Sequence, residues 1–250
     1  MDALLLLPRS ASRALAGAVL ATGCAVAPAA AEPVDLQLIL AIDCSYSVDS
    51  TEFRQQMQGT AAALRDPEVI AAIENGPRGR IAVSLVQWAG NDQQHVTLPW
   101  RRIGNAAEAR AVAEAIAALP RATADGATSV SAMMRFGVSH FARGPYRGDR
   151  RVIDVSSDGR NNFGPVLSLA REFVATQDVT VNGLAITNEI PTLHQYYEQQ
   201  VIVGLGAFVV RAANYADYAR AIRIKLLKEI GYDAVAGAAS SARTLTAARR

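Results

Sequence analysis

The sequence is poor in several residue types that would mark particular classes of protein. Its 250 residues include two cysteines and three histidines, and only two of its 25 basic residues are lysines, Lys225 and Lys228. Two cysteines are too few for a disulfide framework. The formal net charge is +2, with no basic tail or stripe, so nucleic acid is not favoured as a partner. Half of the residues are apolar, which is typical of a globular chain.

Hydrophobic runs long enough to cross a membrane are also missing from the sequence. Near its start, two arginines precede a short apolar stretch (14–27), and an Ala-x-Ala cleavage site ends at Ala31. This arrangement predicts that residues 1–31 are a secretory signal peptide, and therefore a periplasmic or secreted bacterial protein. Cys24 lies in a segment that loosely resembles a lipoprotein processing site, which leaves a lipid anchor as an alternative.

Apolar runs alternate with helical patterns over the rest of the chain. Val34–Asp43 is a nearly continuous aliphatic run, as in a central strand that is buried on both faces. Asp49 and Glu52 form a capping box at the start of the next helix. The same reasoning predicts strands at 80–88, 151–155, 179–186 and 207–210, a hairpin arm at 95–98, and helices at 105–119, 129–141, 165–176, 192–199 and 214–230.

Strands that alternate with helices imply one α/β domain with a doubly wound, mostly parallel central sheet flanked by helices. We place this domain at residues 32–231. The remaining residues, 232–250, are rich in alanine and end in two arginines, so we expect a flexible C-terminal tail.

Polar residues gather in the loops next to the predicted strands and helices. Asp43, Ser45 and Ser47 follow the first strand, Thr128 precedes a middle helix, and Asp158 follows a later strand. Ligands of open α/β sheets bind beyond the carboxyl ends of the strands, so we expect these side chains to converge at one edge. Carboxylate and hydroxyl oxygens are hard donors, which points to Mg²⁺, Mn²⁺ or Ca²⁺.

The pattern Asp43-x-Ser45-x-Ser47, followed by Thr128 and by Asp158 in Ser-Asp-Gly, resembles the metal-ion-dependent adhesion site of von Willebrand factor A domains. The resemblance implies a doubly wound fold in which Ser45, Ser47 and Thr128 hold the metal directly. It also implies that Asp43 and Asp158 act mostly through water. A Glu or Asp of a protein partner would complete the coordination octahedron.

This resemblance covers nearly all of the chain after the predicted signal peptide, from 34 to 230. The C-terminal half, with Tyr-Tyr-Glu at 196–198 and Gly-Ala-Phe-Val at 206–209, looks like a bacterial exported von Willebrand A-like family of unassigned function. Cys44 occupies a variable position of the motif, and we expect its side chain to point into the core. Ala127 stands where a glycine is common, and neither departure removes a ligand.

Each site residue also has an ordinary structural interpretation. Asp43 alone could be a turn or cap residue, Thr128 an N-cap, and Asp158 part of an Asp-Gly turn. The metal-site prediction therefore depends on the whole set occurring in order. Three further polar residues near this edge are expected to cap helices, end strands or form turns: Asp49, Asp154 and Asn161.

The leading hypothesis is an exported protein-binding module, not an enzyme, which captures an acidic residue of a partner through a divalent cation, with Mg²⁺ as the first choice. The sequence has no Gly-x-Ser-x-Gly elbow and no glycine-rich phosphate loop after a strand. Its histidines, His95, His140 and His194, show no metal-ligand spacing. Two alternatives stay open: a metal-dependent phosphoester hydrolase that uses the same oxygens, and a structural envelope protein with a non-functional site.

Overall fold

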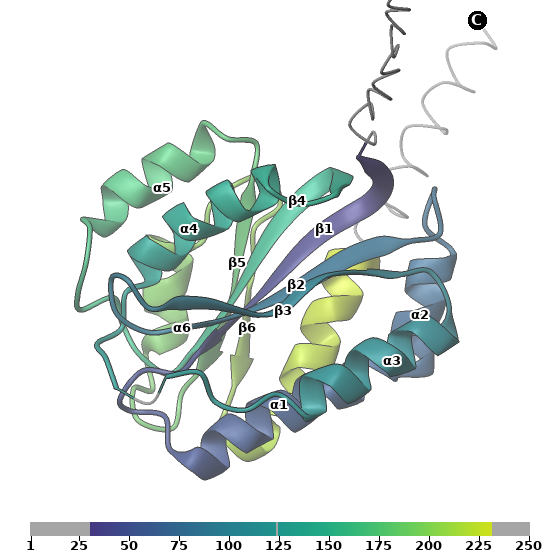
Figure 1. Ribbon diagram of the computed structural model, residues 1–250. Helices are drawn as coiled ribbons and strands as arrows, with labels where there is room; N and C mark the ends of the chain where they lie inside the picture. Colours follow the sequence, from purple (N-terminus) through teal and green to yellow (C-terminus); the bar gives the residue numbers. More distant parts are fainter. Residues whose placement is uncertain (1–30, 124, 232–250) are drawn as a thin grey trace, which may run out of the picture. The chain divides into compact units, whose positions relative to one another are not determined.

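A six-stranded sheet forms the centre of this computed structural model, which describes residues 31–123 and 125–231 (Figure 1). The strands run in the order β3-β2-β1-β4-β5-β6. All neighbours pair in parallel except β2 and β3, which are antiparallel at the edge. The predicted fold class, α/β with a doubly wound and mostly parallel sheet, is confirmed. The strands are β1 (Glu32–Asp43), β2 (Ile81–Trp88), β3 (Gln94–Ile103), β4 (Tyr146–Ser157), β5 (Thr180–Ile186) and β6 (Val209–Ala212).

The predicted signal peptide (1–31) and C-terminal tail (232–250) lie outside the described residues, apart from Ala31. Both therefore stay predictions. Among the helices of the described ranges, none is long and apolar enough to cross a membrane.

Helices cover both faces of the sheet (Figure 1). One face carries α1 (Ser50–Leu64), α2 (Pro67–Glu74), α3 (Ala106–Ala117) and a helix that runs from residue 218 to the last described residue, 231. The other face carries α4 (Val130–Ala142), α5 (Leu167–Ala175), α6 (Leu193–Tyr196) and the π-helical turn η1 (Tyr197–Val201).

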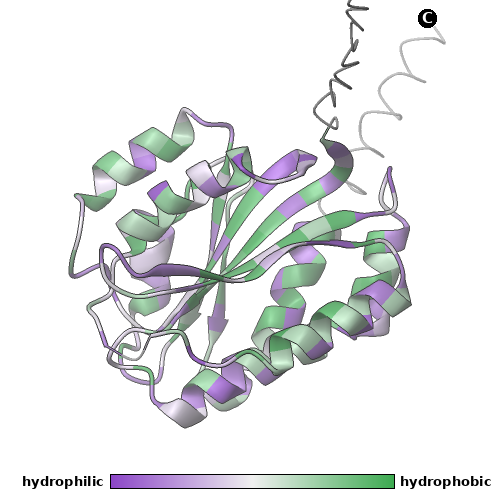
Figure 2. Cartoon of the chain, in the orientation of Figure 1, coloured by the Kyte–Doolittle hydropathy of each residue, from purple (hydrophilic) through white to green (hydrophobic). Residues whose placement is uncertain are grey.

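The central strand β1 supplies side chains to two separate cores. Leu38 and Leu40 pack with α1 and α3 on one face, whereas Ile39 and Ala41 pack with α4 on the other. Because successive side chains of a strand point to opposite faces, a strand is mostly apolar where helices cover both of its faces, as Leu38 to Ile42 are. Figure 2 shows apolar residues along the central strands, while the helices mix apolar and hydrophilic positions.

Several element boundaries differ from the prediction. Helix α2 is absent from the prediction, because Pro67 follows the preceding helix pattern as a stop signal; it also begins a new helix, capped by Asp66. Strand β4 starts at Tyr146, not at 151, since its first half alternates charged residues at the end of the sheet. Strand β6 lies at 209–212, not at 207–210, because Gly206 adopts a positive φ of 69° that belongs to a turn.

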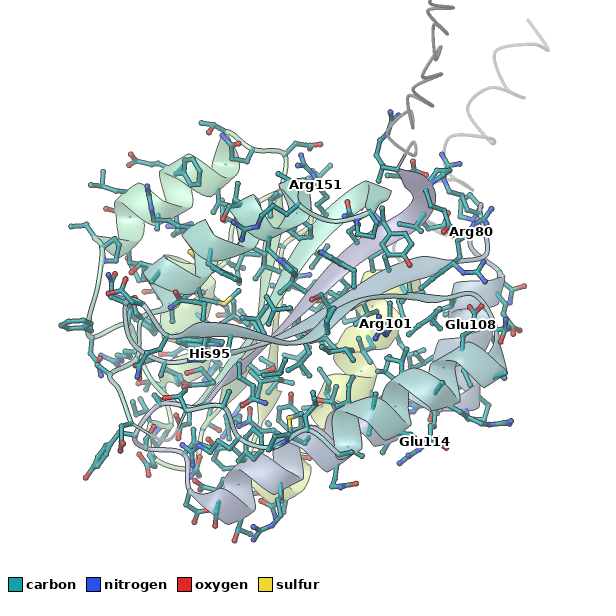
Figure 3. The ribbon with its side chains drawn as sticks, in the orientation of Figure 1. Arg80, His95, Arg101, Glu108, Glu114 and Arg151 are labelled. Carbon is teal, nitrogen blue, oxygen red and sulfur yellow. The ribbon has the colours of Figure 1, made fainter. Side chains whose placement is uncertain are left out.

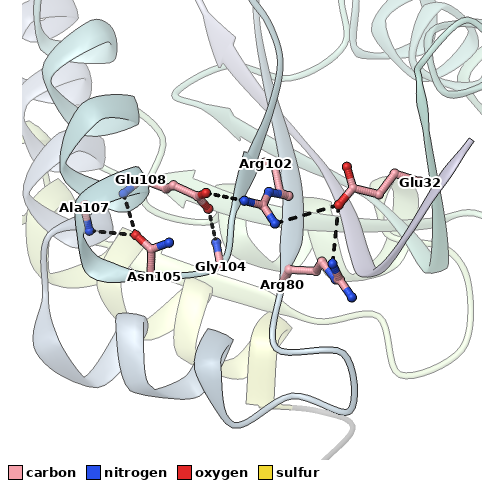
Figure 4. Close-up of polar contacts among 7 residues, drawn as sticks. All are labelled: Glu32, Arg80, Arg102, Gly104, Asn105, Ala107 and Glu108. Atoms are coloured by element: carbon pink, nitrogen blue, oxygen red, sulfur yellow. Dashed lines mark hydrogen bonds and ion pairs between the residues drawn. The ribbon is translucent and has the colours of Figure 1, made fainter.

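Charged residues tie the strands together at the end of the sheet where β1 begins. Arg80 Nη1 and Arg102 Nη1 lie 3.5 and 3.9 Å from Glu32 Oε1, and Arg102 also pairs with Glu108 of α3 (Figure 4). Figure 3 places Arg80 and Glu108 toward this end and His95 toward the other. These pairs are partly exposed, so each contributes little stability. Together they link β1 to β2, β3 and α3.

Candidate metal centre

All five predicted metal residues lie together at the carboxyl edge of the sheet. Asp43 is the last residue of β1, and Ser45 and Ser47 follow it in the loop to α1. Thr128 precedes α4, and Asp158 directly follows β4. Since β1 and β4 are adjacent parallel strands, their carboxyl ends bring these loops to one place, at the lower left of Figure 1.

A chain of short polar contacts joins these side chains. The Thr128 hydroxyl donates to Ser45 Oγ at 3.2 Å, and Ser45 Oγ lies 3.4 Å from Ser47 Oγ. Ser47 in turn donates to Asp158 Oδ1 at 2.9 Å. The remaining carboxylate, Asp43, accepts a hydrogen bond from the backbone N–H of Ser45 at 2.7 Å. Hydroxyl and carboxylate oxygens from separate loops therefore share one small volume.

The two carboxylates of this site are buried, and no basic side chain of the described residues pairs with them. Asp43 is 0% and Asp158 1% exposed, and neither forms an ion pair within the described residues. Burial, together with the charge of Asp158, raises the pKa of Asp43 to about 7, against hydrogen bonds from Ser157 and Ser45 that lower it. The second oxygen of Asp158, Oδ2, has no hydrogen-bond partner among the described residues. A buried carboxylate that lacks an ion pair and a full set of hydrogen bonds lowers the stability of the folded protein.

These residues fit a hard divalent cation. Hydroxyls and carboxylates are the ligands of Mg²⁺, Mn²⁺ and Ca²⁺, and two carboxylates balance one divalent charge. In the described part of the chain, no three His, Cys, Asp or Glu side chains gather as a metal-binding group. A cation at this place would thus depend on Ser45, Ser47 and Thr128 for its remaining ligands.

Three further residues hold the first loop in place by hydrogen bonds, and the sequence did not predict them. The Ser157 hydroxyl donates to Asp43 Oδ2 at 2.5 Å, and Gln56 Nε2 of α1 donates to the Asp43 carbonyl at 3.1 Å. The Arg121 guanidinium donates to the Ser45 carbonyl at 3.2 Å. Ser157 precedes Asp158 directly, so its place at the strand end could have indicated a role. Gln56 and Arg121 gave no such signal, because their contacts are with distant loops.

The loop after β4 also clamps the loop before α4. Asn162 Oδ1 accepts from the Thr128 N–H at 2.9 Å, and the Asn162 N–H donates to the Thr128 carbonyl at 2.9 Å. Asn161 Oδ1 accepts from the N–H of Ser131, in the first turn of α4, at 2.9 Å. The structural role predicted for Asn161 is thus confirmed as a helix-end contact, and these bonds fix the distance between Thr128 and Asp158.

Two tyrosines around the start of η1 brace the Asp158 loop. Tyr197 is fully buried and donates to the Gly159 carbonyl at 3.4 Å, while the hydroxyl of Tyr196 accepts from the Asn161 N–H at 3.3 Å. A Cβ at Gly159 would lie 3.1 Å from Thr128 Oγ1, which is a tight contact, so a larger residue here would push against the Thr128 side chain. The sequence predicts a helix over 192–199, but nothing local connects it to Gly159, which is 38 residues from Tyr197.

Cys44 and Tyr46 occupy the variable positions of the first loop and point in opposite directions. Cys44 lies in the core, as predicted, and its thiol donates to Gln87 Oε1 at 3.6 Å. Burial raises the pKa of this thiol to about 12, so it is not a nucleophile at neutral pH. Tyr46 is 84% exposed, and Phe163, in the loop after Asp158, is 56% exposed. Two large apolar side chains therefore stand free on the loops that carry the site.

Comparison with protein families places nearly the whole described chain in one family model. The model of a protein of unknown function (DUF1194) matches residues 33–234. No curated protein matches the chain at a significant level.

Solved structures with the same fold are von Willebrand A proteins. One of them is proximal thread matrix protein 1 from the mussel byssus, in a structure with zinc in its metal-ion-dependent adhesion site (MIDAS) motif. It aligns with a TM-score of 0.58 and 17% identity, over 80% of this chain and 48% of its own. A von Willebrand factor type A protein from Catenulispora acidiphila aligns with a TM-score of 0.54 and 18% identity, over 79% of this chain and 43% of its own. BatB from Bacteroides thetaiotaomicron aligns with a TM-score of 0.53 and 15% identity, over 79% of this chain and 99% of its own. The chain spans about half the length of the first protein. These similarities establish the von Willebrand A fold.

Proposed function

The chain belongs to the DUF1194 family of proteins of unknown function, and we propose that its von Willebrand A domain binds a protein partner through a divalent cation. Ser45, Ser47 and Thr128 would ligate the cation directly, and Asp43 and Asp158 would hold it mostly through bound water. Mg²⁺ is our first choice, with Mn²⁺ and Ca²⁺ as alternatives. The partner would add a Glu or Asp carboxylate as the last ligand.

The observation that carries this proposal is the pair of buried carboxylates, Asp43 and Asp158, beside three neutral hydroxyls. A divalent cation would balance the two negative charges. The hydroxyls contribute oxygen ligands but no charge, and both carboxylates would act mostly through water, so a cation held here would still accept a carboxylate ligand from outside the chain. The cation would supply this attraction, while the protein residues fix its position at the edge of the sheet.

Apolar side chains around the site support a protein as the partner. Tyr46 and Phe163 are large, exposed and carried by two of the loops that hold the proposed ligands. Aromatic residues are enriched at the centres of protein interfaces, where they bury much area at little entropic cost. We propose that they contact the partner on either side of its carboxylate.

Binding without turnover is part of the proposal. Among the described residues, no histidine hydrogen-bonds to a site residue, and His140 is bonded instead to Ser84 Oγ at 2.9 Å. A hydrolase would need a base to activate water at the cation. We further propose that the protein is exported by a signal peptide at 1–31, with the domain at 32–231 and a tail at 232–250.

The test uses the purified protein, with Thr128→Ala as the site variant. Titration calorimetry with MgCl₂, MnCl₂ and CaCl₂ first measures metal binding. Immobilised wild-type protein is then exposed to envelope proteins in Mg²⁺ or in EDTA, and the proteins retained in Mg²⁺ are identified. The proposal requires a partner that is released by EDTA, is not retained by Thr128→Ala, and binds more weakly once its contacting acidic residue is changed to the amide.

The same preparation separates the alternatives. Steady hydrolysis of a generic phosphoester in Mg²⁺ or Mn²⁺, abolished by Asp43→Ala, would replace the binding proposal by a hydrolase. Failure of the wild-type protein to bind any of the three cations would contradict the proposal and favour a structural role.

A further inference from the structure

Arg121 joins two separate parts of the proposed metal site. It lies in the segment between α3 and α4, which carries the proposed ligand Thr128. Its Nη2 atom donates to the Cys44 carbonyl at 3.0 Å and to the Ser45 carbonyl at 3.2 Å, both in the first loop of the site. Its Nε atom donates to the Thr123 carbonyl at 2.7 Å, within its own segment. One guanidinium therefore links the first loop to the segment that carries Thr128.

One of these bonds reaches Asp43 through a single peptide group. The Cys44 carbonyl, which accepts from Arg121, belongs to the same peptide group as the Ser45 N–H. That N–H donates to Asp43 Oδ1 at 2.7 Å. Hydrogen bonds in a chain polarise one another, so the bond at the carbonyl strengthens the bond at the N–H. Arg121 thus fixes the direction of the peptide group that holds the Asp43 carboxylate.

The backbone on both sides of Arg121 is held by Gln87, a buried residue of the inner strand β2. Gln87 Nε2 donates to the Pro120 carbonyl at 2.9 Å, and Gln87 Oε1 accepts from the Ala122 N–H at 2.6 Å. The guanidinium of Arg121 also lies over the Phe53 ring of α1, with its central carbon 6.0 Å from the ring centroid. The side chain therefore extends from a backbone that the sheet fixes, which gives it a defined position.

The choice of cation depends on how firmly the ligands are held. Mg²⁺ requires near-ideal octahedral geometry at about 2.0–2.1 Å, whereas Ca²⁺ accepts flexible geometry at about 2.3–2.6 Å. The hydroxyls of Ser45 and Thr128, 3.2 Å apart, come from the two parts of the site that Arg121 links. If these parts are held together, the site favours the smaller ion. If they can move apart, it also accepts the larger one.

We propose that Arg121 is a positioning residue that makes the metal site selective for Mg²⁺ over Ca²⁺, by holding the first loop and the segment of Thr128 at a fixed separation. This inference rests on the proposed function, because it needs a cation at the same place. It goes further by naming the residue that decides between two cations which the ligand types alone allow. Residues that orient metal ligands without touching the metal contribute to its affinity.

Arg121→Gln tests the inference, because it removes the guanidinium that reaches both parts of the site. Titration calorimetry of the full chain with MgCl₂ and with CaCl₂ measures the two affinities, and the weaker ion is measured by competition against the stronger. We expect the affinity for Mg²⁺ to fall about 10- to 100-fold, as for other residues that orient metal ligands. The affinity for Ca²⁺ should fall much less, so the ratio of the two affinities should shift toward Ca²⁺.

Arg121→Lys separates the position of the guanidinium from its charge. Lysine keeps the positive charge, but its ammonium is a compact point charge in place of a planar fork of donors. It therefore cannot hold the first loop and its own segment in the same geometry. We expect Arg121→Lys to lose Mg²⁺ affinity and selectivity as Arg121→Gln does.

The ratio of the affinities also separates positioning from a general loss of stability. Only the folded protein binds either ion at this site, so a variant that is partly unfolded loses affinity for Mg²⁺ and Ca²⁺ by the same factor. Urea unfolding in EDTA measures how much of each variant is folded.

Arg151→Gln is the matched control, toward the opposite end of the sheet (Figure 3). Arg151 is partly buried, as Arg121 is, and its Nη2 atom donates to the Gln177 carbonyl at 2.5 Å, beyond the end of α5. Removing this guanidinium should leave the affinity for Mg²⁺ and the ratio of the two affinities unchanged, even if the stability in EDTA falls.

The outcomes distinguish this inference from the proposed function. A wild-type protein that binds Mg²⁺, with Arg121→Gln binding it within twofold, overturns the role of Arg121 and leaves the metal site standing. So does an equal loss of affinity for Mg²⁺ and Ca²⁺, a wild type that prefers Ca²⁺, or full Mg²⁺ affinity in Arg121→Lys, since charge would then act in place of position. A wild-type protein that binds no divalent cation overturns both.

Discussion

Asp43 and Asp158 stand at the carboxyl ends of adjacent parallel strands, both almost completely buried, and the charge of Asp158 helps to raise the pKa of Asp43 to about 7. Like charges that share a buried site destabilise the folded chain unless a cation joins them. The two carboxylates therefore lower the stability of the metal-free protein, as is typical of residues in binding sites.

Asp43→Asn should make the metal-free protein more stable. A folded-state pKa above the unfolded value means that the ionised carboxylate destabilises the fold, increasingly as the pH rises from 3.8 to about 7 and fully above that. At pH 8 in EDTA, urea unfolding should show a gain of up to roughly 4 kcal/mol over the wild type. The gain should be small at pH 4. A variant that is less stable than the wild type in EDTA at pH 8 would contradict the account.

Ser157→Ala should weaken metal binding without unfolding the domain. The lost hydroxyl donates to Asp43 Oδ2 and fixes the direction of that carboxylate. We expect the affinity for Mg²⁺ to fall about tenfold or more, measured by titration calorimetry. Ser139→Ala is the control, because Ser139 is exposed on α4 and bonds only its own helix, at the Phe136 carbonyl. Equal affinities in the two variants would count against a role for Ser157.

Stability should also depend on pH through His140, away from the metal site. Its Nε2 lies 2.9 Å from Ser84 Oγ, and its ring stacks on Trp100. Burial, with a smaller effect of Arg143, lowers the pKa of His140 to about 4. The neutral ring therefore stabilises the fold fully above about pH 6.5, and this contribution is lost as the pH falls from 6.5 through 4. It amounts to up to roughly 3 kcal/mol.

His140→Phe should remove this dependence. In urea unfolding, the stability of the wild type relative to the variant should fall as the pH falls from 7 to 4. A constant difference over this range would mean that His140 is not held in its neutral form by the fold.

On the face of the sheet opposite to His140, a buried cluster of charged side chains makes a prediction about stability alone. Lys225 Nζ lies 2.8 Å from Asp154 Oδ1 and 2.5 Å from Glu229 Oε1, and all three side chains are buried. One ammonium thus faces two carboxylates, and burial together with the charge of Glu229 raises the pKa of Asp154.

Asp154→Asn should therefore stabilise the protein above neutral pH and change it little near pH 4. Lys225→Met should destabilise the protein by about 3–5 kcal/mol at neutral pH, because it leaves two buried carboxylates without a cation, although Asn182 still donates to Glu229. Chemical unfolding of both variants at pH 4 and 8 measures the two effects. If both changes destabilise the protein at pH 8, the cluster does not carry an excess of negative charge.

The sequence was sufficient to predict the fold and the convergence of the five proposed metal residues at one edge of the sheet, for physical reasons that are local; their role as metal ligands stays a prediction. A strand buried on both faces needs an unbroken apolar run, and Asp43, Thr128 and Asp158 lie where predicted strands end or helices begin. Apart from helix α2 and several element boundaries, the features that escaped prediction are long-range. Asp154, expected at a strand end, lies within β4, where it pairs with Lys225 from a helix that is distant in the sequence.

The supporting residues of the site escaped for the same reason. Tyr197 donates a hydrogen bond to the Gly159 carbonyl in the Asp158 loop, and its sequence neighbourhood predicts only a helix. This partner could be identified only once β4 and β5 were placed side by side.

Thermal unfolding in EDTA and in rising Mg²⁺, with Thr128→Ala in parallel, tests the central claim most directly. A ligand bound only by the folded state adds about 2.7 kcal/mol at a hundred times its dissociation constant. For a domain of this size, each kcal/mol raises the midpoint by roughly 2–4 °C. We expect a saturable rise of several degrees in the wild type that is absent from Thr128→Ala. Identical midpoints with and without Mg²⁺, Mn²⁺ or Ca²⁺ would contradict it.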